Sequence, residues 1–99
     1  MTSIRFTWDP DKAESNRRKH GIRFEDAAHV FFDPFRQTRQ DRIEGGEYRW
    51  QTIGVVGGVT VLLVAHTFPA EDEDGEEIRI ISARPATRRE RKQYEQENR

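Results

Sequence analysis

The chain has 99 residues, of which 33% are hydrophobic and 35% are charged, with a net charge of −1 and no cysteine. This length gives one domain over residues 1–99, and the lack of cysteine excludes disulfides and thiolate metal sites. No apolar run approaches the ~18 residues of a membrane-spanning helix, and the N-terminus lacks the apolar core of a signal peptide. We therefore expect a cytosolic protein that makes no membrane contact.

The first third of the chain predicts a strand followed by two helices. Residues 4–8 alternate apolar and polar side chains, as in a half-buried strand. Asp9-Pro10 is a favourable helix start and Gly21 a favourable helix end, so these residues bound the first helix. The apolar side chains of residues 24–31 recur at helical spacing, and Asp33-Pro34 should end this second helix.

The middle of the chain predicts a hairpin. Residues 35–43 are polar and remain ambiguous between a loop and an edge strand. Residues 47–56 and 59–68 are expected to form two strands joined by a tight turn at Gly57-Gly58, because glycine accepts the positive φ that such turns require. The second of these strands is apolar on both faces in its middle, which is typical of a central strand.

The segment 71–77 holds six acidic residues in seven positions, and we expect a long acidic loop over 69–77. Without these six, 17 basic residues face 12 acidic ones, a net charge of +5. Residues 78–84 predict the last strand, and Pro85 opens a helix over about 86–98. The order β-α-α-β-β-β-α with short strand connections predicts an α+β fold, an antiparallel sheet packed with helices.

The first helix is polar nearly all round, with Ala13 as its single apolar residue. Lys12, Asn16, Lys19 and His20 share one helical face. This face is either solvated or a basic wall that contacts phosphates, and the composition leaves both interpretations open.

The last helix is also poor in apolar residues. It carries Arg88, Arg89, Arg91 and Lys92 within five positions. These side chains either form local surface ion pairs or make an arm that contacts phosphates or a protein partner.

His66, at the end of the predicted central strand, and Arg79 and Arg84, on the next, are candidates for a site. A histidine suits proton transfer near neutral pH, and an arginine stabilises charge on a phosphate oxygen. Arg79 and Arg84 are an odd number of positions apart, so they share a face only if a bulge intervenes or if Arg84 belongs to the turn. The three histidines lack metal-ligand spacing, and no nucleotide-binding motif is present, so we expect no metal and no cofactor.

Ordered motifs at both ends of the chain resemble the BrnT family. At the start these are residues 6–13 (FTWDPDKA), 19–22 (KHGI) and 30–34 (VFFDP), and at the end they are residues 78–84 (IRIISAR) and 86–95. The resemblance covers nearly the whole chain. One departure is visible: family members often have a basic residue soon after the position of His66-Thr67, whereas here Phe68-Pro69 and the acidic segment follow.

The resemblance implies a type II toxin with a RelE-like ribonuclease fold that cleaves RNA and so inhibits translation and growth. It also implies a BrnA-type antitoxin of ribbon-helix-helix class, a heterotetrameric complex with that antitoxin, and DNA binding only through the complex. RelE-like nucleases resemble metal-free RNases, in which the 2′-hydroxyl attacks the adjacent phosphate and leaves 2′,3′-cyclic phosphate and 5′-hydroxyl ends.

The candidate residues are assigned to this chemistry as a hypothesis. His66 is expected to transfer protons, with His20 as a second acid, and Arg79 to stabilise the phosphate charge. Lys12, Lys19, Arg84 and Arg88 are expected to position RNA. The acidic segment is either a tolerated insertion, a device that repels RNA or a contact for basic antitoxin residues.

Two other functional classes fit the same residues. A non-catalytic nucleic-acid-binding regulator would use the basic helices but leave RNA intact, and its binding would weaken steeply with salt. A pure interaction module would bind only a protein partner. The chemical ends of any RNA product distinguish these classes from a nuclease.

Overall fold

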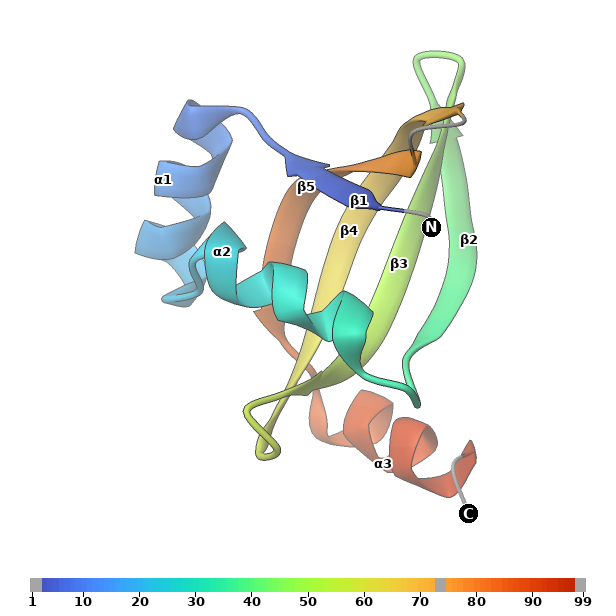
Figure 1. Cartoon of the computed structure of the whole chain (residues 1–99). Helices are drawn as coiled ribbons and strands as arrows, with labels where there is room; N and C mark the ends of the chain where they lie inside the picture. The colour runs from blue at the N-terminus through green and yellow to red at the C-terminus, as the bar shows by residue number, and fades with distance from the viewer. Residues whose placement is uncertain (1–2, 73–74, 98–99) are drawn as a thin grey trace.

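The computed structural model describes residues 3–72 and 75–97, which form one five-stranded sheet with helices on both sides (Figure 1). In chain order its elements are β1 (Ile4–Thr7), α1 (Pro10–His20), α2 (Phe24–Ala27), the 3-10 helix η1 (Ala28–Phe32), β2 (Gln37–Glu44), β3 (Glu47–Val56), β4 (Thr60–Asp72), β5 (Gly75–Pro85) and α3 (Arg88–Glu97). Within these residues, every helix is too short or too polar to cross a bilayer.

The strands lie in the order β1-β5-β4-β3-β2, so the α+β class and a sheet packed with helices are confirmed. The sheet is antiparallel from β2 to β5, whereas β1 runs parallel to β5, with Phe6 beside Ile78. The parallel pair arises because β1 and β5 are separated by nearly the whole chain. Short connections fix the direction of sequential neighbours only.

Two segments differ from the sequence expectations. The ambiguous segment before Glu47 forms β2, an edge strand paired with β3. The acidic loop expected over 69–77 is wrong for most of its length, because β4 continues to Asp72 and β5 begins at Gly75. Backbone hydrogen bonds extend this hairpin whatever the side-chain charge. The hairpin turn expected at Gly57-Gly58 is confirmed, and both glycines have positive φ, 65° and 74°.

The main hydrophobic core lies on one face of the sheet, which we call the helix face, under α2 and η1. Phe24, Ala27, Val30 and Phe31 supply the stripe that the sequence spacing predicts, and they pack on buried side chains of β4 and β5: Leu62, Val64, Ile78, Ile80 and Ala83. The partly buried Trp8 packs edge-on against Phe24 at 5.9 Å between ring centroids and so extends this core.

A β-bulge in β5 decides which side chains share a face. Ala65 pairs with Ser82, but the next residue of β4, His66, pairs with Ile80, so Ile81 is left without a partner in the register. Ile80 and Ala83 therefore both face the core despite their odd spacing. The same bulge brings Arg79 and Arg84 onto one face, the face opposite the core, which we call the open face.

The first helix is attached to the sheet through a polar residue. Asn16 is buried at 6% exposure, and its amide nitrogen donates to the carbonyls of Ala83 (2.9 Å) and Ile22 (3.1 Å). Its amide oxygen accepts from the Ala83 N–H at 3.0 Å. One side chain thus satisfies both backbone groups of Ala83 at the edge of β5. The side of α1 that carries Lys12, Asn16, Lys19 and His20 is therefore not a free basic surface, because Asn16, in its middle, is turned to the sheet.

Replacing Asn16 with alanine is expected to lower the free energy of unfolding by about 2–4 kcal/mol, because it leaves buried N–H and C=O groups without partners. Urea denaturation measures the change. Ser15→Ala is the matched control, since Ser15 is exposed on the same helix. A loss at Asn16 no greater than the loss at Ser15 would show that the edge contact contributes little.

Candidate functional site

The open face of the sheet carries arginine side chains from three strands. Arg39 lies opposite Gln51, and Arg42 lies opposite Arg49, on the same face as Gln51 by strand alternation. Arg79 lies opposite Thr67 and Arg84 opposite Leu63. We call this set the open-face arginines: Arg39, Arg42, Arg49, Arg79 and Arg84.

Helix α3 covers one end of the open face (Figure 1). Tyr94 packs with Ile53 and Val61, which fixes the helix on β3 and β4. A cavity of about 100 Å³ lies between α3 and the strands, lined by Gln37, Arg39, Gln51, Ile53, Leu63, Glu90, Gln93 and Tyr94. Amide, guanidinium and carboxylate groups at a partly covered cleft are suited to hydrogen bonding with a polar ligand.

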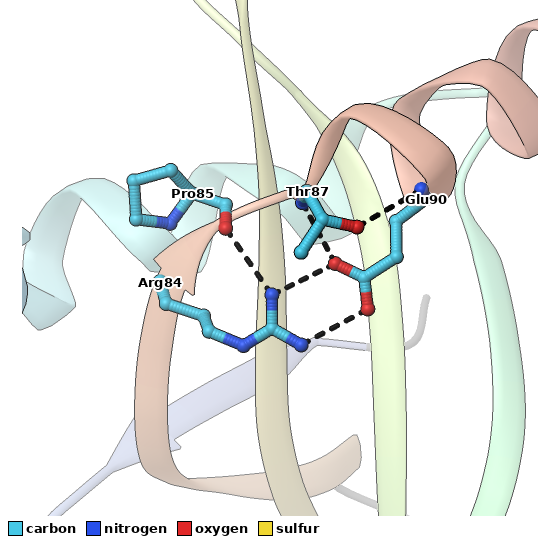
Figure 2. Close-up of polar contacts among 4 residues, drawn as sticks. All are labelled: Arg84, Pro85, Thr87 and Glu90. Atoms are coloured by element: carbon cyan, nitrogen blue, oxygen red, sulfur yellow. Dashed lines mark hydrogen bonds and ion pairs between the residues drawn. The ribbon is translucent and has the colours of Figure 1, made fainter.

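The N-terminus of α3 is held by Arg84 and Glu90 (Figure 2). The guanidinium donates to both carboxylate oxygens, at 2.7 and 2.9 Å. Glu90 also accepts from the backbone N–H of Thr87 (2.8 Å), while the Thr87 hydroxyl accepts from the Glu90 N–H (3.1 Å), which together make a capping box. The hydrogen bond from Arg84 lowers the pKa of Glu90 to about 2. The Arg84 guanidinium is therefore occupied by Glu90, and its role is to position α3.

Asp33 joins α3 to the loop before β2. It is buried at 5% exposure, and its carboxylate accepts from the Phe35 N–H (2.9 Å), the Val55 N–H (2.8 Å) and the Tyr94 hydroxyl in a short hydrogen bond. Burial alone would raise the pKa of Asp33, but the hydrogen bond from Tyr94 and those from the two N–H groups outweigh it and lower the pKa. Burial and the contact with Asp33 raise the pKa of Tyr94 to about 12.

Sequence reasoning missed Asp33, Arg39 and the partners of Tyr94. Asp33-Pro34 predicts only a helix end, and it does end η1. The spacing Thr87-x-x-Glu90 is a capping-box signal that the sequence does carry. Arg39 gave no signal, because the strand that bears it was ambiguous.

His66 lies in the core, away from the open-face arginines. It is 0% exposed on the helix face, its Nε2 is 2.7 Å from the Thr52 hydroxyl, and its ring meets Phe31 and Phe68 edge-on at 4.9 Å. It is also in the middle of β4 and not at its end. Burial lowers the pKa of His66 to about 4. This placement is that of a packed, hydrogen-bonded residue, and we remove His66 from the candidate catalytic set.

The buried His66 should make stability depend on pH. Its folded-state pKa lies below the ordinary 6.5, so protonation favours unfolding, and the stability present above pH 6.5 should fall as pH drops toward 4. The loss attributable to this group is about 1–3 kcal/mol. Urea denaturation across this range should give a steeper decline for the native chain than for His66→Gln. Parallel declines would contradict the assignment.

The other predicted site residues do not converge on one point. Lys12 and Arg79 line the same hollow at the outer side of β1, together with Thr7, Asp9 and Glu77. Lys19 is exposed on α1, and His20 is half-buried at its end. Arg88 is exposed at the first residue of α3. Among the residues placed by the structure, no group of three or more histidines and carboxylates could hold a metal ion.

Comparison with known proteins identifies the family. Residues 8–90 match the family model described as the ribonuclease toxin, BrnT, of type II toxin-antitoxin systems. This chain belongs to the BrnT family. As a member of the BrnT family it is a ribonuclease toxin of a type II toxin-antitoxin system, which implies RNA as substrate and an antitoxin as partner.

A solved structure agrees with the BrnT fold. The chain is similar to the 1.1 Å crystal structure of the Brucella abortus ribonuclease toxin, BrnT, with a TM-score of 0.62 and 23% sequence identity. The alignment covers 87% of this chain and 100% of the other. The match supports the α+β fold expected from the sequence. A search among curated proteins finds no match.

Proposed function

We propose that this BrnT-family toxin is a metal-free endoribonuclease that binds RNA along the open face of its sheet. The observation that carries the proposal is that the open-face arginines share one face of the sheet with the cleft beside α3, which Arg39 lines. Arginine binds phosphate through two parallel hydrogen bonds, and the cleft offers amide groups of Gln37, Gln51 and Gln93 for a base or a sugar.

The proposed reaction needs no protein nucleophile. The 2′-oxygen loses its proton and attacks the adjacent phosphorus, and the bond from phosphorus to the 5′-oxygen breaks. The leaving oxygen takes up a proton, so the products are a 2′,3′-cyclic phosphate and a 5′-hydroxyl. The protein must hold the attacking and leaving oxygens in line and stabilise the charge on the phosphoryl oxygens.

Arg79 and Arg39 are proposed for charge stabilisation. The side chain of Arg79 is 50% exposed and lies 3.8 Å from Glu77, a contact that a phosphate can replace. Arg39 is exposed and lines the cleft. Lys12 extends the basic surface from Arg79, whereas Arg84 acts by holding α3 in place.

The remaining predicted residues take peripheral roles. Lys19 and Arg88 are proposed to contact more distant phosphates of the RNA. His20 lies at the end of α1 and His66 in the core, so neither histidine is assigned to the cleft. The proposed catalysis therefore rests on in-line positioning and arginine charge.

We also propose which protein binds the toxin and what RNA cleavage does in the cell. The antitoxin is proposed to be a BrnA-type ribbon-helix-helix protein that forms a heterotetramer with the toxin and supplies all DNA binding. RNA cleavage in the cytosol would inhibit translation and arrest growth until the antitoxin neutralises the toxin.

The test uses the purified chain, free of antitoxin, with end-labelled RNA in EDTA. Cleavage that leaves 2′,3′-cyclic phosphate and 5′-hydroxyl ends would establish the proposed chemistry. Cleavage that requires added divalent cation would overturn the metal-free mechanism. RNA that is bound but stays intact, both alone and with translating ribosomes, would indicate a non-catalytic regulator instead.

A further inference from the structure

Helices α2 and η1 leave one end of the helix face uncovered (Figure 1). Exposed apolar side chains lie at this end and on the last residue of η1. Phe32 is 63% exposed, Ile43 58%, Tyr48 53% and Phe68 40%. Ile4 and the half-buried Trp50 lie on the same face. We call these residues the aromatic patch: Ile4, Phe32, Ile43, Tyr48, Trp50 and Phe68.

Ring contacts connect members of the patch to the core. Phe68 meets Trp50 at 5.6 Å and His66 at 4.9 Å between ring centroids. Phe32 meets Phe6 at 6.1 Å, and Phe6 and His66 both contact Phe31. Ile43 and Tyr48 are direct partners between β2 and β3. Exposed apolar side chains scattered singly are ordinary, whereas several that gather on one face are typical of an interaction site.

An acidic side chain, Glu76, lies beside the patch. In the sequence, segment 71–77 of the β4–β5 hairpin holds six acidic residues, and one of them, Glu77, lies on the open face, where it accepts a hydrogen bond from the Thr7 hydroxyl at 2.9 Å. Glu76 is the register partner of Ile4 and so lies on the patch side of the sheet. The Glu76 carboxylate repels phosphate and attracts a partner that has basic side chains beside its apolar ones.

We propose that the aromatic patch binds a basic, amphipathic segment of the antitoxin, on the face opposite the open-face arginines. The existence of an antitoxin rests on membership of the family, and the proposal does not depend on the cleavage chemistry. A second copy of this chain is a poorer occupant, because a two-fold dimer would bring the Glu76 carboxylates of both copies to one interface. The basic side chains of the antitoxin segment offset the charge of Glu76, while its apolar side covers the rings of the aromatic patch.

The experiment measures the Kd of the purified cognate antitoxin for variants of the full chain by calorimetry. Phe32→Ser and Ile43→Ser should each weaken binding by about tenfold or more, as expected for apolar anchors. Val59→Ser is the matched control, since Val59 is 81% exposed but lies in the β3–β4 turn. It should leave Kd unchanged.

The contribution of the Glu76 charge is tested separately. Glu76→Lys should weaken binding at low salt, and high salt should diminish the difference from the native chain. Glu95→Lys, an exposed acid of α3, is its control and should have no such effect. Melting curves of each free variant establish that it is folded, and RNA cleavage by Phe32→Ser and Ile43→Ser should match the native chain.

Two results would overturn the proposal. The first is a Kd for folded Phe32→Ser and Ile43→Ser that equals that of Val59→Ser. The second is a free chain that dimerises through the patch, so that both variants become monomers while their affinity for the antitoxin is unchanged. Neither result depends on whether the native chain cleaves RNA.

Discussion

Replacing Arg79 with alanine is expected to lower the rate of RNA cleavage by the free toxin about 10²–10³-fold, while the fold is retained. The side chain is half exposed on the open face, and Glu77, 3.8 Å away, keeps its hydrogen bond from the Thr7 hydroxyl when Arg79 is removed. Its loss removes charge stabilisation where the phosphorane forms. Single-turnover cleavage of labelled RNA, with a melting curve for each variant, measures the effect.

Control variants distinguish a catalytic role of Arg79 from a general effect of positive charge on RNA binding. Arg23→Ala removes an exposed arginine that pairs with Glu25 at the start of α2, away from the open face, and should leave the rate within about twofold. Arg79→Lys keeps the charge but loses the bidentate geometry, so its rate should be intermediate. Arg39→Ala should also reduce cleavage. Equal rates for Arg79→Ala and Arg23→Ala would remove Arg79 from the site.

Replacing Asp33 with alanine is expected to cost about 3–5 kcal/mol of the free energy of unfolding, close to the total stability of many small domains. The substitution removes the carboxylate that accepts hydrogen bonds from the N–H groups of Val55 and Phe35 and from the Tyr94 hydroxyl. The chain should be largely unfolded or strongly shifted in urea midpoint. Tyr94→Phe, which removes one hydrogen bond and keeps the ring, should cost only about 1–2 kcal/mol.

The Asp33 contacts also predict an acid-sensitive C-terminal helix. The folded-state pKa of Asp33 lies below its ordinary 3.8, and that of Glu90 lies at about 2, below 4.5. Their contribution to stability is present above these ordinary values and is lost as pH falls through the folded values. Denaturation near pH 3 should therefore affect the native chain more than Asp33→Asn. An Asp33→Ala protein as stable as the native one would refute the anchoring role.

The aromatic patch and the open-face arginines together describe a toxin with one face for each partner. RNA phosphates meet arginine on the face that α3 partly covers. The antitoxin segment is proposed to meet the rings and Glu76 on the other. Substitutions on the two faces should then separate toxicity from neutralisation.

The sequence by itself predicted the elements whose signals are local. Asp9-Pro10 and Gly21 bound α1, the apolar spacing of residues 24–31 produced the core stripe of α2 and η1, and Gly57-Gly58 made the hairpin turn. The family could also be recognised, because its motifs are ordered along nearly the whole chain. These features depend on residues that lie close together in the sequence, so the local pattern is enough to predict them.

Tertiary structure alone decided which side chains meet. A single bulged residue in β5 brought Arg79 and Arg84 to one face, and burial under η1 turned His66 from a catalytic candidate into part of the core. The partners of Asn16 and Asp33 lie 67 residues (Ala83) and 61 residues (Tyr94) away along the chain. Register and burial arise from contacts between distant segments, so residue type and local spacing do not contain them.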